Sequence, residues 1–204
     1  MSRADPHQLP PLPLRERKRL AAMRRIQDVA IEQFERHGFD DVTIEQVAAA
    51  SDVSPSSVYR YFGTKEQLVV WDPHDAAAVH VVGQQLPDLL PTQAIRTIVV
   101  GTLGEAFRAD EDRIRRRLQL AFTHPSIEAA LDLQATQLTP AIAALLAYHL
   151  DRAPDDLDVQ VLAYAFVGGL MGALRHWHAS GYTTPVEALI ERPLAFLERG
   201  LELS

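Results

Sequence analysis

The 204-residue sequence contains no cysteine, and none of its uninterrupted apolar runs approaches the roughly 18 residues expected of a membrane-spanning helix. Without cysteine the chain has no disulfide, no thiol nucleophile and no cysteine-ligated zinc or iron–sulfur site. Its first residues also lack the basic and then apolar order of a signal peptide. These absences predict a cytoplasmic protein with no membrane partner.

Sequence patterns that mark common enzymes are absent as well. There is no GxSxG motif and no glycine-rich phosphate-binding loop. The histidine pairs His74 with His80 and His176 with His178 lack the four-residue spacing of a helical metal site. We therefore expect no enzymatic activity, no metal site and no cofactor.

The acidic charge of the chain is confined to its second part. The formal net charge is −7, but residues 1–70 hold 10 Lys and Arg against 10 Asp and Glu, whereas residues 71–204 hold 10 against 17. The segment from Arg15 to Arg25 is strongly basic, with Glu16 as its single acidic residue. Such a cluster indicates DNA binding, although a solvated helix end has the same composition. A DNA-binding surface is therefore expected only in the first part.

The start of the chain is predicted to be a flexible arm followed by a helix. Residues 1–14 include four prolines and few large apolar side chains, a composition that disfavours a fold of its own. From Arg15 onward, apolar residues recur at steps of three and four. We expect the resulting helix to end at Gly38, because glycine readily adopts the left-handed conformation of a helix end.

The next residues contain three signals for helix starts in close succession. Thr43-Ile44-Glu45-Gln46 has the spacing of a capping box and predicts a helix that runs to about Ala50. Ser54 followed by Pro55 predicts a second short helix that reaches about Phe62. A further box that begins at Thr64 predicts a longer helix, which we expect to leave the first domain and to transmit movement rigidly to the second.

Two short helices joined by a tight turn and packed on a longer helix form a helix-turn-helix. The second of them, with the sequence SPSSVYRYF, would enter the major groove. Ser56 and Ser57 lie in its first turn, close to base edges, and Tyr59, Arg60 and Tyr61 supply donors for phosphates. A simpler interpretation remains open, in which the serines only cap the helix and the tyrosines are ordinary surface residues.

The stretch TIEQVAAASDVSPSSVYRYFGTKEQL, from Thr43 to Leu68, resembles the TetR family of transcriptional regulators. Asp52 stands where the family usually has a turn glycine, and Ser56 stands where a base-facing glycine is frequent, which leaves the base preference open. The resemblance implies that Thr43 and Lys65 bind phosphates and that Pro55 and Ser56 lie nearest the bases. The residues expected to contact DNA are Thr43, Ser54, Pro55, Ser56, Ser57, Tyr59, Arg60, Tyr61 and Lys65.

Residues 71–204 are predicted to form a second domain that is helical throughout. The segment 156–180 is apolar on more than one face and therefore needs two partners, and the terminal segment 185–201 is amphipathic. The TetR resemblance implies that these two helices pair with their symmetry mates in a homodimer. The alternative is that both belong to the core of a monomer.

The second domain is also the expected site of a small-molecule effector. Its layout loosely resembles the TetR subgroup with an acyl-CoA-like ligand-binding domain. Apolar side chains with a few polar groups among them are typical of ligand pockets, but each of them alone is also compatible with the core. The candidates are Phe107, Leu120, Phe122, Gln134, Gln137, Tyr164, Met171 and Trp177, with Arg116 or Arg117 for an anionic group of the ligand.

The sequence therefore predicts an all-α protein with an arm at 1–14, a helix-turn-helix domain at 15–70 and an effector-binding and dimerisation domain at 71–204. The predicted function is that of a transcriptional repressor, which binds palindromic double-stranded DNA as a dimer and is released by an effector. An architectural DNA-binding protein without ligand control is the alternative. Its expected basic charge throughout does not agree with the acidic second domain.

Overall fold

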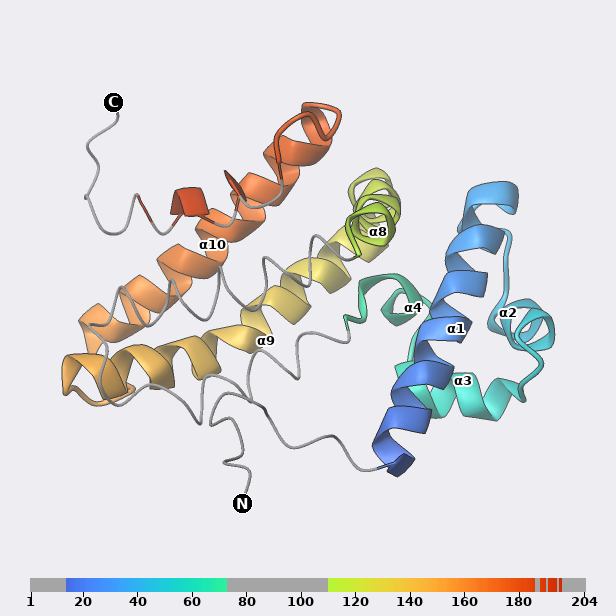
Figure 1. Ribbon diagram of the computed structural model, residues 1–204, viewed down its shortest axis with the longest axis horizontal. Helices are drawn as coiled ribbons and strands as arrows, with labels where there is room; N and C mark the ends of the chain where they lie inside the picture. The colour runs from blue at the N-terminus through green and yellow to red at the C-terminus, as the bar shows by residue number, and fades with distance from the viewer. Residues whose placement is uncertain (1–13, 73–109, 186–187, 190, 194, 196–204) are drawn as a thin grey trace, which may run out of the picture.

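A computed structural model describes residues 14–72, 110–185, 188, 189, 191–193 and 195, and within these residues the chain is all-α, with no strand (Figure 1). The arm, the helices expected within 73–109, Phe107 and most of the terminal helix lie outside the described residues. The helices are α1 (Leu14–His37), α2 (Ile44–Ala50), α3 (Pro55–Phe62), α4 (Gln67–Val70), α8 (Glu111–Thr123), α9 (Pro125–Leu150) and α10 (Leu157–Ala179).

The helix starts of the first domain follow the capping signals in the sequence. The side chain of Thr43 accepts a hydrogen bond from the backbone N–H of Gln46 at 3.2 Å, and the Gln46 side chain accepts one from the N–H of Thr43 at 2.7 Å. Ser54 caps α3 by accepting from the N–H of Ser57 at 3.3 Å, with Pro55 in the first helical position. These reciprocal bonds satisfy amide donors that the first turn of a helix leaves unpaired.

Three residues with positive φ lie at the turns of this domain, namely Gly38, Asp52 and Gly63. Gly38 has φ +88° and ends α1, as predicted. Asp52 has φ 55° in the turn between α2 and α3, a conformation that aspartate tolerates better than most residues. The aspartate therefore adopts the left-handed conformation that a glycine would readily adopt in this turn.

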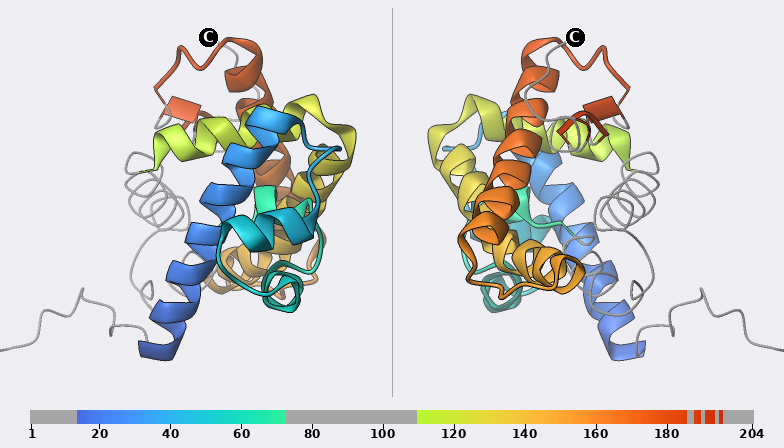
Figure 2. Two further views of the ribbon diagram at one scale, coloured as in Figure 1. Left: turned by 90° about the vertical axis from the view of Figure 1, so that its right-hand side faces the viewer. Right: turned by 90° about the vertical axis from the view of Figure 1, so that its left-hand side faces the viewer.

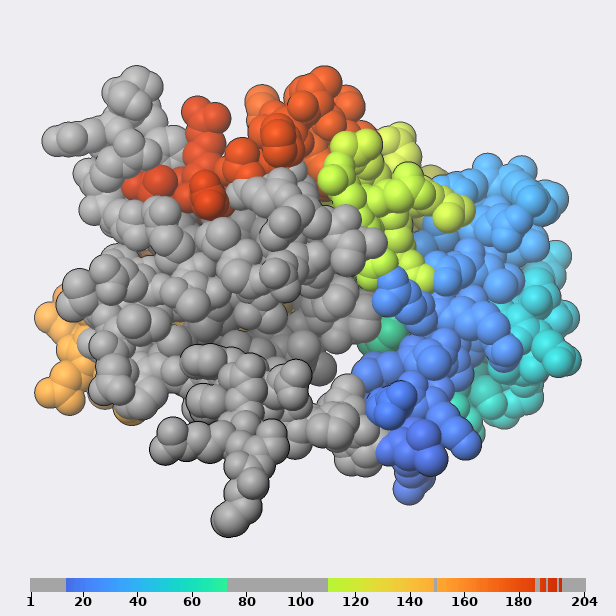
Figure 3. Space-filling view, in the orientation of Figure 1, coloured from blue at the N-terminus to red at the C-terminus, as the bar shows by residue number. Residues whose placement is uncertain are grey.

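The core of the first domain forms where α1 packs against α2, α3 and α4. Met23, Ile26 and Phe34 of α1 are buried along one stripe, and Val58 and Phe62 of α3 face the same core. Figure 2 shows α2 and α3 against one side of α1, and Figure 3 shows this unit as one end of the molecule. α3 therefore has an inner face fixed by packing and an outer face directed to solvent.

The predicted long fourth helix is wrong. α4 covers only Gln67–Val70, and Trp71 already has φ −52° and ψ 130°. Thr64 still accepts from the N–H of Gln67 at 3.3 Å, so the start signal is used, but the helix ends within one turn. The reason is that side chains from other helices bind the carbonyl oxygens at its end.

The second domain places α8 and α9 between the first domain and α10. α9 packs chiefly against α10, while α8 contacts α1, α4, α9 and α10 (Figure 1). α10 begins at the cap residue Asp156, whose carboxylate accepts from the N–H groups of Asp158 and Val159 at 2.9 and 3.4 Å. Its bounds agree with the predicted segment 156–180.

α10 is also the helix in the described part of the chain that is long and apolar enough to cross a membrane by length and composition alone. A search for uninterrupted apolar runs misses this helix, because polar residues such as Gln160 interrupt its sequence. One face of α10, which includes Phe166 and Trp177, is buried against the neighbouring helices, and core helices pass the same test. The other face exposes large apolar side chains, among them Leu157, Val161 and Tyr164.

Candidate nucleic-acid interface

The first turn of α3 presents a cluster of hydroxyl groups to solvent. Ser54, Pro55 and Ser56 are exposed and Ser57 is half-buried. The Oγ atom of Ser54 lies 2.9 Å from the Oγ atoms of both Ser56 and Ser57. A compact turn with small side chains and donors allows the backbone to approach a partner closely, as base edges in a major groove require.

Longer side chains flank this turn on the same helix. Tyr59 is 48% exposed, and its hydroxyl lies 3.5 Å from the carboxylate of Glu45 on α2. Arg60 lies over the ring of Tyr61 at 5.0 Å and donates to Ser57 Oγ at 3.3 Å. Tyr61 itself is half-buried and packs against the core, so Tyr59 and Arg60 are the side chains that extend furthest from the outer face.

The two predicted phosphate-binding residues outside α3 lie at helix starts. Thr43 is exposed and its hydroxyl serves the capping box of α2. Lys65 is half-buried, and its Nζ donates to the carbonyl oxygen of Asp40 at 3.3 Å. Of the basic segment on α1, Arg15, Arg17 and Lys18 are exposed to solvent, whereas other members bind protein acceptors.

The end of α4 is held by a buried arginine of α8. Arg117 is 8% exposed, and its Nε and one terminal nitrogen donate to the carbonyl oxygens of Val69 and Val70 at 2.7 and 2.5 Å. The other terminal nitrogen donates to the carboxylate of Asp72 at 2.8 Å. We call Arg117, Asp72 and the two carbonyls the Arg117 cluster, and it joins the second domain to the DNA-binding unit.

Two glutamines complete the binding of the α4 carbonyls. Gln27 of α1 is fully buried and donates to the carbonyl oxygens of Val69 and Trp71 at 3.3 and 2.8 Å. Gln134 of α9 donates to that of Val70 at 3.0 Å. The last carbonyls of a helix have no partner within the helix, so these side chains satisfy them in place of a further turn.

A second set of contacts joins α1 to α8 and its cap residue Asp110 through ion pairs that differ in exposure. Arg116 donates to both carboxylate oxygens of Glu35 at 2.8 and 2.6 Å, and this hydrogen bonding raises the pKa of its guanidinium. Arg113 pairs with Asp28, and burial lowers the pKa of Arg113. Arg24 pairs with Asp110. These pairs lie beside the Arg117 cluster along the same boundary.

The Arg117 cluster was not predicted from the sequence, and Arg117 and Gln134 were assigned to another role. Arg117 and Gln134 were candidates for effector binding, and the structure gives both of them backbone acceptors at the end of α4. A signal existed in the sequence, because Arg117 lies four residues before Ala121 and three after Ile114 on the buried stripe of α8. A charged residue at a buried position needs a partner, but the sequence does not say which one.

The remaining effector candidates within the described residues do not gather around one cavity. Leu120 packs into the core shared with the first domain, whereas Met171 and Trp177 belong to a separate cluster between α8 and α10, with Phe122 against it. The Trp177 Nε1 donates to the carbonyl oxygen of Thr184 at 2.8 Å. Gln137 and Tyr164 are exposed.

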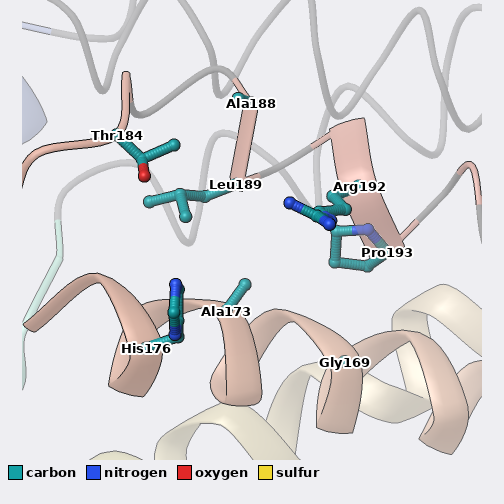
Figure 4. A pocket seen from close by; sticks show the side chains of 8 residues that line it. All are labelled: Gly169, Ala173, His176, Thr184, Ala188, Leu189, Arg192 and Pro193. Carbon is teal, nitrogen blue, oxygen red and sulfur yellow. The ribbon is translucent and has the colours of Figure 1, made fainter. Parts of the chain in front are cut away.

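A cavity of about 490 Å³ lies between α10 and the residues that follow it (Figure 4). Its walls include Gly169, Ala173 and His176 of α10, with Leu189 and Pro193 opposite. Gly169 permits the close approach at one end, since a Cβ atom there would lie 3.2 Å from Pro193 Cβ. None of the effector candidates within the described residues lines this cavity, whose walls come from the two segments predicted to form the dimer.

Comparison with known proteins identifies the chain from both of its parts. Residues 26–70 match the family described as bacterial regulatory proteins, tetR family, and residues 89–202 match the MftR C-terminal domain. The chain belongs to the TetR family. It is thus a transcriptional regulator of the ligand-responsive, DNA-binding repressor type rather than an enzyme.

Relatives of this TetR-family regulator extend over nearly its whole length. A Mycobacterium tuberculosis protein named as the mycofactocin biosynthesis transcriptional regulator MftR is 27% identical over 180 residues, which cover 85% of this chain and 88% of the relative. FadR of Thermus thermophilus, solved with lauroyl-CoA, has a TM-score of 0.60 at 20% identity and covers 89% of this chain and 96% of its own. FadR of Bacillus halodurans has a TM-score of 0.61 at 18% identity, with 89% and 97% covered. The two solved structures show a shared fold.

The Arg117 cluster predicts unequal effects for two adjacent arginines. Arg117→Met removes the guanidinium that pairs with the largely buried Asp72 carboxylate and donates to two carbonyl oxygens of α4, so we expect the free energy of unfolding to fall by about 3–5 kcal/mol. Arg116→Met removes a half-exposed pair with Glu35 and is expected to cost less than about 1 kcal/mol. Urea denaturation measures both, and equal losses would contradict the structural importance of the Arg117 cluster.

Proposed function

We propose that this chain is a dimeric repressor that acts in the cytoplasm, binds a palindromic DNA operator through α3 and leaves it when a small, largely apolar effector binds in the C-terminal domain. The observation that carries the DNA-binding proposal is the division of α3 into two faces. Val58 and Phe62 are buried, while Ser54, Ser56 and Tyr59 face solvent on one rigid, capped helix. A helix held in this way can enter a major groove without reordering.

The roles of the interface residues follow from their reach and exposure. The short side chains of the first turn, Pro55, Ser56 and Ser57, come nearest the bases. Tyr59 and Arg60 reach outward to phosphates, and Thr43 and Lys65 bind phosphates beside α3, where contacts position the helix without reading sequence. Ser54 caps the helix, and Tyr61 supports Arg60 from the half-buried side.

The dimer proposal is supported by the outer face of α10. Leu157, Val161 and Tyr164 are 76%, 57% and 56% exposed, and Gly168 and Gly172 continue the same face with no side chain to prevent close packing. An exposed apolar stripe of this length is unusual on a monomer. A second copy of α10 on this face, joined by the segment 185–201, would cover it.

The release proposal depends on the boundary between the domains. Because α4 ends at Val70, a movement in the C-terminal domain reaches α3 through the Arg117 cluster and the α1–α8 ion pairs rather than through a continuous helix. Arg116 and Arg117 already bind protein acceptors, so we infer that apolar contacts provide most of the affinity for an effector. Acyl-CoA thioesters are the first class to test, since lauroyl-CoA is bound in the Thermus FadR structure.

The DNA-binding proposal predicts the outcome of a selection from genomic DNA. The purified protein should recover one or a few palindromic fragments, with half-sites about 34–36 Å or a multiple of this apart. Uniform recovery of fragments would instead indicate an architectural protein.

Tyr59→Phe should weaken binding to matched and scrambled operators alike, by about 1 kcal/mol, whereas Ser56→Ala should change the preferred base. If both variants behave alike on the two duplexes, the assigned roles are wrong.

The dimer proposal predicts that a charge on the outer face of α10 separates the protomers. Val161→Glu should sediment with the mass of one chain at micromolar concentration, while the wild type sediments as two. Leu133→Glu is the matched control, because Leu133 is 60% exposed on α9, outside the proposed interface. A dimeric Val161→Glu protein would contradict this interface.

The release proposal predicts that operator DNA and effector weaken each other equally. Calorimetry with lauroyl-CoA, with and without the recovered operator, should give affinities that differ by a coupling free energy of about 1–3 kcal/mol, or about 5- to 150-fold. The same factor should appear in operator affinity with and without lauroyl-CoA. If lauroyl-CoA binds equally well in both states, it is not a releasing effector, since only differential binding shifts a population.

A further inference from the structure

Lys65 does not extend freely into solvent. Its Nζ lies 4.4 Å from the centre of the Phe39 ring and 5.8 Å from that of Phe34, and it donates to the carbonyl oxygen of Asp40 at 3.3 Å. A lysine side chain normally samples many rotamers and loses that freedom when it binds a phosphate. The ring and the carbonyl oxygen therefore hold the ammonium group in one place before any partner arrives.

The Phe39 ring that contacts Lys65 also contacts the second domain. Phe39 is buried, and its ring packs edge-on against Phe34 with the centroids 5.0 Å apart. The ring of His124 lies 5.5 Å from it, tilted by 58°. Phe39 thus lies between the lysine of the DNA-binding unit and a histidine of the other domain.

His124 is fixed at the corner where α8 meets α9. It is the residue between the two helices, and its Nδ1 lies 3.1 Å from both the carbonyl oxygen of Leu120 and the hydroxyl of Thr123. These bonds orient the imidazole ring on the end of α8. A movement of this corner therefore moves the surface on which Phe39 rests.

We propose that Phe39 is a positioning residue for DNA binding, which holds Lys65 against the phosphate backbone and is itself supported by His124 of the α8–α9 corner. This contact reaches the interface separately from the Arg117 cluster, which acts on the end of α4. The inference rests on the proposed contact between Lys65 and a phosphate. Phe39 would touch no DNA itself, yet it would determine how much Lys65 contributes to binding.

The salt dependence of DNA binding distinguishes this role from a general contribution to stability. Each phosphate contact releases counterions and contributes roughly 0.9 to the slope of log affinity against log salt concentration. Lys65→Met should therefore lower the slope by about 1.8 for a dimer with two such contacts. Phe39→Leu should lower it by a similar amount, and adding Phe39→Leu to Lys65→Met should change it little further. The measurement uses fluorescence anisotropy with a labelled DNA duplex of mixed sequence.

Three variants complete the design. Ile26→Val removes volume from the same buried core, about two turns before Phe34 on α1, and should leave the slope unchanged. His124→Ala should lower the slope, whereas His124→Phe keeps an aromatic ring on Phe39 and should restore it. Because His124 is half-buried at a helix end, these two variants test the inference even if Phe39→Leu does not fold.

The outcomes separate the inference from the function on which it rests. An unchanged slope in Lys65→Met would refute the phosphate contact, and the positioning role with it. A reduced slope in Lys65→Met together with an unchanged slope in folded Phe39→Leu, or in His124→Ala, would overturn the positioning role alone. A reduced slope in Ile26→Val would also overturn it, because any loss of core packing would then have the same effect.

Discussion

The buried guanidinium of Arg117 determines how the two domains of this regulator are held relative to each other. It donates to two carbonyl oxygens at the end of α4 and to the carboxylate of Asp72, so one side chain of α8 fixes both the place where α4 stops and the direction in which the chain leaves it. A buried charge of this kind costs desolvation and is retained only where its partners are well placed. The position of α3 therefore depends on a contact made by the other domain.

The other contacts at this boundary differ in charge and in exposure to solvent, so they should respond differently to salt concentration. Gln27 and Gln134 add neutral hydrogen bonds to the same carbonyls, whereas Arg116 and Glu35 form a half-exposed ion pair and the Arg113 that pairs with Asp28 is only 12% exposed. Salt screens exposed pairs and leaves buried ones nearly unchanged. A higher salt concentration should thus weaken the Arg116–Glu35 pair, while the Arg117 cluster keeps α4 in place.

The sequence was informative where structure is determined locally. The capping box at Thr43, the Ser54-Pro55 start of α3 and the glycine end of α1 depend on neighbours within four residues, and the structure confirms them. The short α4 could not be predicted, because the donors that end it come from residues 27, 117 and 134, far away along the chain. For the same reason Arg117 and Gln134 resembled ligand-binding residues in the sequence, since a buried polar side chain has the same pattern whatever its partner is.

Spin-label distances across the proposed dimer test directly whether the Arg117 cluster positions α3, and the absence of native cysteine makes the labelling specific. A label at Ala49→Cys, on the exposed side of α2, reports the separation of the two DNA-binding units. We expect one narrow distance distribution when Arg117 is present. Arg117→Lys keeps the positive charge but replaces the planar guanidinium, whose three nitrogens reach three separate acceptors, with one compact ammonium group, and it should broaden or shift the distribution without loss of helix content. Identical distributions in the two proteins would contradict the claim that the Arg117 cluster positions α3.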